Sequence, residues 1–149
     1  MAFIVRDAGF DHATLTKSFP FSHSSFELPQ LTVTSPQLVH FFCLYGPPPS
    51  KKNGLTESAS FSEFCDFLEH CSLLRGKVLI VGDFNFHIDC PINSNTVYIM
   101  DMLQTFRFSQ AVSVLTHRCG HTLILVVHRE DLFFVQCQFA VVCLLIICL

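Results

Sequence analysis

The pattern of hydrophobic and polar positions predicts short apolar strands with helices between them. The most pronounced apolar run, Val78 to Val81, ends at Gly82 and is followed by the polar residues Asp83 and Asn85 on either side of a phenylalanine. A short, β-branched run bounded by a glycine is typical of a buried strand. Polar side chains that follow such a strand lie at its carboxyl end, where α/β folds place their binding sites. The segment 77–85 is therefore the first candidate for a functional site.

Other segments also have strand character. They are 2–6, 26–34, 38–45, 108–114 and 122–127. The connection between 26–34 and 38–45 is so short that we expect these two strands to be antiparallel. His40, inside the strand 38–45, is expected to be a hydrogen-bonded core residue rather than a ligand. The stretch 10–25 is rich in Ser, Thr, Phe and Pro and shows no period, so we predict a loop there.

Apolar residues at helical spacing predict two helices. The first covers 60–74, with Ser60 as N-cap and Glu63 completing a capping box. The second follows an N-cap at Asn95. Its apolar face consists of Ile99, Met102, Leu103 and Phe106. A strand, a helix and a second strand in succession form a crossover unit, which predicts one parallel strand pair and an α/β fold with helices outside a mixed sheet.

Composition supports a folded chain without a general affinity for nucleic acid. Half of the 149 residues are hydrophobic, 17 are phenylalanine, and only 14% are charged, with a net charge of −3. These values exclude a disordered chain and leave no overall basic surface. The eight cysteines contain no C-x-x-C pair and no secretory signal is apparent, so we expect reduced and mostly buried thiols. The cluster of His117, Cys119 and His121 matches no common zinc spacing.

The residues 131–149 differ from the residues 1–130, which we take as one domain. Between Leu132 and Leu149 no residue is charged, and the only polar side chains are Gln136 and Gln138. Eighteen such residues are near the lower length limit of a membrane span. A membrane anchor, a buried terminal strand or helix, and a segment never selected as part of a fold all remain open.

Asp83 and Asn85 have a spacing that suits phosphoryl chemistry. At positions i and i+2 of an extended chain, their side chains point to the same side. A carboxylate can accept a proton from a water nucleophile or help to hold a divalent ion, and an amide can bind a phosphate oxygen without repelling it. An Asp-x-Asn sequence also occurs in ordinary turns, where both side chains bond to the backbone. The polar tip with Lys51 and Lys52 is either a solvated loop or a phosphate contact at the rim of the site.

Three segments of the sequence follow one another in an order that is found in a known protein family. They are LVHFFCLYGPPP, KVLIVGDFN and THRCGHTLILV. In this order they resemble the endonuclease/exonuclease/phosphatase fold and, more closely, the apurinic-like endonuclease domain of non-LTR (LINE-type) retrotransposons. The resemblance covers roughly residues 2–130 and implies a two-layer β-sandwich flanked by helices, with Mg²⁺-dependent nicking of DNA. It implies that Tyr45, followed by Pro47, acts at the scissile phosphate, that Asp83 orients or activates the attacking water, and that Asn85 contacts phosphate and helps to hold the metal.

The chain also departs from the pattern of this family. Ile124 stands where the resemblance places the aspartate that orients the catalytic histidine, and no Ser-Asp-His follows. The family's metal-binding glutamate would lie upstream of Ala2, and none of the histidines 117, 121 and 128 has the family context. We therefore expect a truncated, partial sandwich and a catalytically impaired Mg²⁺ endonuclease with weak affinity for DNA. Loss of an acid/base group typically costs about 10²–10⁴-fold in rate.

The alternative is a non-catalytic membrane-associated or interaction protein that is anchored by residues 132–149. The first interpretation predicts a nuclear or cytoplasmic protein if the chain is soluble, and the second predicts a membrane location.

Overall fold

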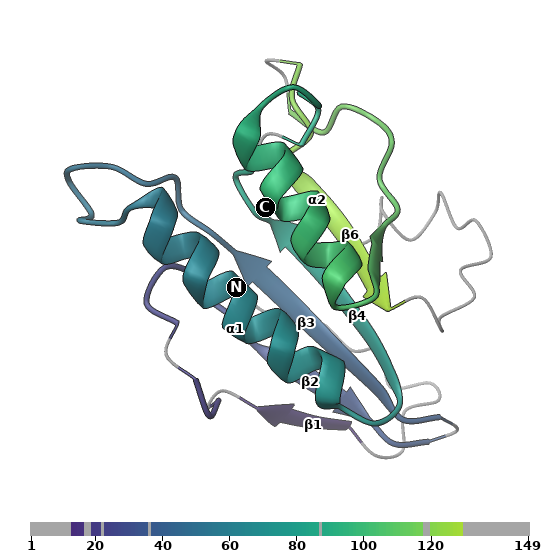
Figure 1. Ribbon diagram of the computed structural model, residues 1–149. Coiled ribbons are helices and arrows are strands. Elements are labelled where there is room, and N and C mark those ends of the chain that lie inside the picture. Colours follow the sequence, from purple (N-terminus) through teal and green to yellow (C-terminus); the bar gives the residue numbers. More distant parts are fainter. Residues whose placement is uncertain are drawn as a thin grey trace.

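A six-stranded mixed sheet with two helices makes up the described part of the chain, which confirms the α/β class (Figure 1). The computed structural model describes residues 13–16, 19–21, 23–35, 37–86, 88–117 and 120–129. The predicted strand 2–6 and the segment 131–149 lie outside these residues. The elements are β1 (Ala13–Thr16), β2 (Gln30–Val33), β3 (Val39–Tyr45), α1 (Glu57–Leu73), β4 (Lys77–Asp83), α2 (Ser94–Thr105), β5 (Phe108–Gln110) and β6 (Ile124–Arg129). Neither of these helices is long and apolar enough to cross a membrane.

The strand order is β1-β2-β3-β4-β6-β5, with β3 and β4 at the centre. These two strands are parallel and are joined through α1, as the crossover pattern predicts. The other four pairs of neighbouring strands are antiparallel, including the predicted β2–β3 pair. The parallel pairing matters for function because it brings the carboxyl ends of β3 and β4 to the same edge of the sheet.

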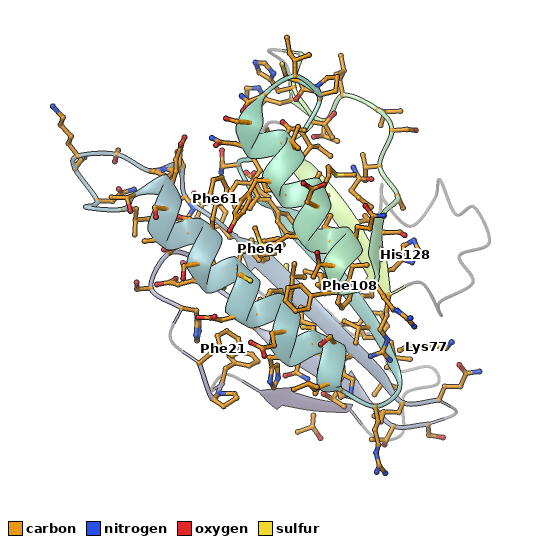
Figure 2. All side chains as sticks on the ribbon, in the orientation of Figure 1. Phe21, Phe61, Phe64, Lys77, Phe108 and His128 are labelled. Atoms are coloured by element: carbon orange, nitrogen blue, oxygen red, sulfur yellow. The ribbon has the colours of Figure 1, made fainter. Side chains whose placement is uncertain are left out.

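Both helices lie on one face of the sheet and cover a core rich in phenylalanine (Figure 1). Phe64 and Phe67 of α1 are 1% and 0% exposed, and the rings of Phe67 and Phe42 have centroids 5.1 Å apart. Phe61 and Phe64 lie on the side of α1 that faces α2 (Figure 2). Burial of these rings accounts for the high phenylalanine content, because each removes a large apolar area from water.

Neither described helix lies on the opposite face of the sheet, which we term the helix-free face for that reason, and it carries a smaller aliphatic cluster. It consists of Leu79, Val81, Val112 and Val126, with Phe41 packed against them. Side chains alternate along a strand. In β4, therefore, Val78 and Ile80 belong to the helix-covered core while Leu79 and Val81 belong to the helix-free face.

His40 is a buried core histidine, as predicted. Its Nε2 bonds to the carbonyl oxygen of Arg75 at 3.0 Å, and its Nδ1 lies 3.0 Å from Nε2 of Gln30. Burial lowers the pKa of His40, which favours a neutral ring that donates from Nε2 and accepts at Nδ1. The ring therefore fastens β3 to the end of α1.

The predicted capping box of the first helix is wrong. The helix begins at Glu57, and its N-cap is Thr56, whose hydroxyl accepts a hydrogen bond from the amide of Ala59 at 3.2 Å. Ser60 is buried one turn inside the helix. The carboxylate of Glu63 instead accepts hydrogen bonds from the hydroxyl of Ser24 and the amide of Ser25, both at 2.7 Å. The first turn is polar and exposed, so apolar periodicity does not reveal it.

Other boundaries also shift. The N-cap of α2 is Asn93, whose side chain accepts a bond from the amide of Asn95 at 2.8 Å, but the predicted apolar face of this helix is confirmed. Strand β2 is shorter than predicted because Pro29, which has no amide hydrogen, precedes its first residue. The prediction of a loop over residues 10–25 is partly wrong, because β1 lies within that range. That short edge strand is held by backbone pairing with β2, which leaves little hydrophobic pattern in the sequence.

Candidate functional site

Tyr45 and Asp83 lie directly opposite each other at the ends of β3 and β4. Both side chains alternate with residues of the helix-covered core, so both belong to the helix-free face. Tyr45 is 38% exposed, and Asp83 is partly buried. The sheet therefore presents a phenol and a carboxylate side by side at an accessible edge.

Gly82 allows β3 and β4 to approach closely just before this edge. A Cβ atom at this position would lie 1.8 Å from the carbonyl oxygen of Leu44. No side chain fits that space, so the glycine of the G-D-F-N motif is required by the packing of the two strands. It sets the spacing between the strand ends that carry Tyr45 and Asp83.

Asn85 connects the two strand ends through hydrogen bonds. Its side-chain nitrogen donates to the carbonyl oxygen of Gly46 at 2.6 Å, and its backbone amide donates to Oδ1 of Asp83 at 3.1 Å. The amide of Gly46 in turn donates to the carbonyl oxygen of Asp83 at 2.8 Å. Together these bonds hold the residue after Tyr45 against the turn that follows Asp83.

The expectation that Asp83 and Asn85 share one side of an extended chain is wrong. Strand β4 ends at Asp83, and Asn85 has a φ of 51°, in the left-handed region. Asparagine tolerates this conformation better than most residues. The hydrogen bonds are those of an Asp-x-Asn turn, and within the described part of the chain they use one carboxylate oxygen of Asp83 and the amide nitrogen of Asn85. The second carboxylate oxygen and the amide oxygen keep acceptor capacity for an incoming ligand.

The electrostatic surroundings favour a protonatable carboxyl group at this edge. Burial raises the pKa of Asp83 above its usual value, and the amide of Asn85 and the nearby His117 offset part of that increase. A raised pKa makes a carboxylate a better proton acceptor. Asp83 is therefore the group at this edge with the chemistry of a general base.

Asp83 and Asn85 offer a partial set of ligands for Mg²⁺. This ion often uses one or two carboxylates together with water and substrate phosphate oxygens. One carboxylate and one amide oxygen fit such a set, although the described residues include no group of three His, Cys, Asp or Glu that could hold a metal. Ile124 lies directly opposite Asp83 in β6, so an apolar side chain occupies the position where the resemblance places the aspartate that orients the catalytic histidine.

The sequence interpretation did not identify Asp89 and did not name His121 as a candidate site residue. Oδ2 of Asp89 lies 3.0 Å from Nδ1 of His121, and its Oδ1 accepts the amide of Thr122 at 3.0 Å. The bond from the Thr122 amide, followed by the bond to His121, lowers the pKa of Asp89 to about 2. These contacts tie the loop after β4 to the loop before β6. Because 32 residues separate the two partners, no local pattern reveals the pair.

A hollow of about 110 Å³ adjoins Asn85 between the first turns of α1 and α2. Its lining includes Pro49, Glu57, Phe61, Phe86, Asn93 and Asn95. The side-chain nitrogen of Asn95 donates to Glu57 at 3.1 Å and so joins the two helices across it. The carboxylate of Glu57 makes the hollow unsuited to an anion.

The loop between β3 and α1 extends away from the sheet (Figure 1). Lys51 and Lys52 are exposed at its tip, where Asn53 accepts the amide of Ser50 at 3.0 Å and donates to the carbonyl oxygen of Pro48 at 3.0 Å. These bonds give the tip its own turn structure. A contact between the lysines and a phosphate stays a prediction.

Four of the cysteines, at positions 43, 65, 71 and 90, are free thiols among the described residues, and two of them, Cys43 and Cys71, are buried.

No protein-family model matches the chain, and no curated protein shows a significant match to it.

Proposed function

We propose that the chain is a piece of an endonuclease of the endonuclease/exonuclease/phosphatase type, similar to the apurinic-like domain of LINE-type retrotransposons. In this proposal it binds a DNA phosphodiester at Tyr45, Asp83 and Asn85 and cleaves it poorly. The observation that carries the proposal is the direct pairing of Tyr45 with Asp83 at the ends of two parallel strands. These are the two residues that the resemblance assigns to the scissile phosphate and to the attacking water.

Each side chain has a role that its surroundings support. The exposed Tyr45 donates its phenolic hydrogen to a phosphate oxygen. Asn85, fixed by its bond to Gly46, contributes an amide oxygen. Asp83 orients a water molecule and accepts its proton, which the raised pKa favours. A bound Mg²⁺, held by Asp83 and Asn85 together with the phosphate, would neutralise charge on the phosphate.

Impaired cleavage follows from Ile124. An isoleucine neither accepts a hydrogen bond from a histidine nor orients its ring, and this one lies beside Asp83. A missing acid/base partner lowers the rate by about 10²–10⁴-fold, while phosphate contacts at Tyr45 and Asn85 are unaffected. The proposal therefore separates binding, which is retained, from turnover, which is slow.

The finer fold assignment belongs to the same proposal. A two-layer sandwich needs a sheet with apolar side chains on the face that meets the second layer. The described sheet has both helices on one face and the cluster of Leu79, Val81 and Val126 on the other. This arrangement supports one layer of such a sandwich.

A plasmid-nicking assay with Mg²⁺ tests the proposal on the full chain. We expect slow nicking that requires Mg²⁺ and is lost in Asp83→Ala, with Tyr45→Phe reducing it and Asp101→Ala, at an exposed position of α2, leaving it unchanged. Nicking that persists in Asp83→Ala would contradict the site. Turnover on the order of 1 s⁻¹ or faster would contradict the impairment.

Binding is measured separately with a labelled DNA duplex at several salt concentrations. We expect weak, salt-dependent binding that Tyr45→Ala and Asn85→Ala reduce. Failure of the full chain to bind DNA at low salt would remove the nucleic-acid function. The membrane-anchored alternative stays a prediction, and carbonate extraction of the chain with and without residues 132–149 tests it.

A further inference from the structure

An open groove, which we term the interhelical groove, lies along α1 beside the start of α2. It encloses about 550 Å³, a volume in the range of ligand-binding sites. Its lining includes side chains from both helices, namely Glu57, Phe61, Cys65, Asp66, Asn95 and Tyr98. Three of these, Glu57, Phe61 and Asn95, also line the smaller hollow at Asn85. The groove is therefore a second concave surface, on the helical side of the molecule.

The charged side chains of the groove are acidic. Glu57 and Asp66 are both exposed, and no Lys, Arg or His of the described ranges lines the groove. Burial raises the pKa of the Cys65 thiol, and the charges of Asp66 and Glu69 raise it further. The groove therefore disfavours an anion such as a DNA phosphate and favours a cation.

The amino termini of the two helices oppose this preference only at one end of the groove. Helix α1 begins at Glu57 and α2 at Ser94, and each terminus carries a partial positive charge of about half a unit that acts within the first turn. The carboxylate of Glu57 offsets these charges. Asp66 lies nine residues further along α1, at about 13 Å along the helix axis, so it is beyond their reach.

Aromatic rings beside Glu57 suit a flat cation. Tyr98 is 51% exposed, and its ring centroid lies 5.5 Å from that of Phe61, which is on the side of α1 that faces α2 (Figure 2). The side-chain nitrogen of Asn95 donates to Glu57 at 3.1 Å and holds the carboxylate at this place. A guanidinium group can stack on a ring while its N–H groups bond to a carboxylate, whereas an ammonium group is a compact point charge. This end of the groove therefore fits arginine better than lysine.

We propose that the interhelical groove binds an extended, arginine-bearing segment of a partner protein. One guanidinium group bonds to Glu57 and stacks on Tyr98, and a second bonds to Asp66. An extended chain rises about 3.3 Å per residue, so the two arginines are about four residues apart. This inference is independent of the proposed nuclease activity, because the groove disfavours DNA.

Fluorescence anisotropy with short labelled peptides tests the ligand class on the full chain. The probe is Arg-Gly-Ser-Gly-Arg, and the controls are Lys-Gly-Ser-Gly-Lys and a peptide of the probe's composition with its two arginines adjacent. We expect the probe to bind at least about threefold more tightly than either control. Equal affinities, or no binding of the probe at 1 mM on the order of the weakest specific complexes, would overturn the proposal. Tighter binding of spermine or of a DNA duplex than of the probe would also overturn it.

Substitutions in the groove test its location. We expect Glu57→Gln to raise the Kd of the probe by about three- to tenfold, because it removes a charged acceptor. Tyr98→Ala should raise the Kd by about two- to fivefold, and Tyr98→Phe, which keeps the ring, should bind the probe as the unsubstituted chain does. Asp101→Asn is the control, since it removes one negative charge from an exposed position of α2 outside the groove. Equal effects of Glu57→Gln and Asp101→Asn would overturn the proposal.

Cys65 gives a measurement on the unsubstituted chain that does not depend on the folding of any variant. It lines the groove and is partly exposed, whereas Cys90 is partly exposed outside it. Iodoacetamide labelling, with each thiol resolved by mass spectrometry, should slow at Cys65 when the probe is added and stay constant at Cys90. Unchanged labelling of Cys65 at a saturating concentration of the probe, or equal slowing at both thiols, would overturn the proposal.

Discussion

The two faces of β4 differ in what they bury and in what they present at the end of the strand. Toward the helices, Val78 and Ile80 pack against phenylalanine rings, and Phe84 returns to the same core with 1% of its surface exposed. Toward the other face, Leu79 and Val81 form a smaller aliphatic cluster that leads to Asp83. One strand thus supports a large aromatic core on one side and the candidate site on the other.

The two faces therefore differ in role: one stabilises the fold, and the other leads to the side chains of the candidate site. Among the described residues, the helix-covered face holds most of the buried apolar side chains and the ring contacts, so it contributes more to stability than the helix-free face does. The candidate site depends on the spacing of two strand ends and on a turn stabilised by Asn85. We therefore expect substitutions on the helix-covered face to unfold the chain, and substitutions at the strand ends to alter the site at a smaller cost.

The largest effect is expected from Phe67→Ala. Its ring is fully buried and lies 5.1 Å from that of Phe42 and 6.1 Å from that of Phe64, between centroids. Removing it should lower the free energy of unfolding by about 3–5 kcal/mol, measured by urea denaturation. Leu73→Ala in the same helix, at a side chain that is 79% exposed, is the control and should change it by less than about 0.5 kcal/mol. Similar effects of the two variants would show that the aromatic core is not the main support.

Gly82→Ala should come next, because it affects both faces at once. Its added methyl group would lie 1.8 Å from the carbonyl oxygen of Leu44 and must push β3 and β4 apart. We expect a loss of about 1–3 kcal/mol in unfolding free energy, together with loss of DNA binding at the strand ends. Gly54→Ala meets no atom within 4 Å and, at a φ of +70°, should cost only about 1 kcal/mol and leave binding intact. Unchanged DNA binding in Gly82→Ala would place the binding site elsewhere.

A pair of substitutions at Asn85 separates its conformation from its hydrogen bond. Both Asn85→Gly and Asn85→Ala lose the bond to Gly46, but only alanine is strained at a φ of 51°. Thermal or urea unfolding should show Asn85→Ala to be less stable than Asn85→Gly by about 1 kcal/mol. Equal stabilities would mean that the turn changes conformation once the side chain is removed.

The smallest effect is expected from Asp89→Asn, and it depends on pH. The pKa of Asp89 falls to about 2 in the folded chain, so its carboxylate stabilises the fold above the unfolded value of 3.8, and this contribution is lost as the pH falls toward 2. Between pH 6 and pH 3 the midpoint of thermal unfolding should therefore fall less in Asp89→Asn than in the unsubstituted chain. Asp101→Asn, at an exposed residue of α2, is the control. A fall in Asp89→Asn as large as in the unsubstituted chain would contradict the contact with His121 and Thr122.

Much of the central fold follows from local pattern. The apolar run that ends at Gly82 predicts β4, and helical spacing of apolar residues predicts the buried faces of both helices. A strand, a helix and a strand in succession predict the parallel pair, and this pairing already places Tyr45 and Asp83 at one edge. These features are accessible because burial imposes a period on the side chains of each element separately.

Helix starts and the edge strand do not follow from that pattern. Thr56 and Ser60 are both residue types that favour an N-cap. The helix begins after Thr56, but its first turn is exposed and polar, so the apolar pattern does not distinguish the two positions. The edge strand β1 is held by backbone hydrogen bonds, which any sequence of low turn propensity can make. Local composition is therefore ambiguous at both places.

What the sequence determined by itself is the central strands, the two helices with their buried sides, and the edge at which Tyr45 and Asp83 meet. The tertiary structure decided the left-handed turn at Asn85, the close approach of Gly82 to Leu44 and the pairing of Asp89 with His121. Those features join residues far apart in the chain or depend on the distance between two strands. Periodicity describes one element at a time, whereas hydrogen bonds and contacts between elements exist only after the elements have packed.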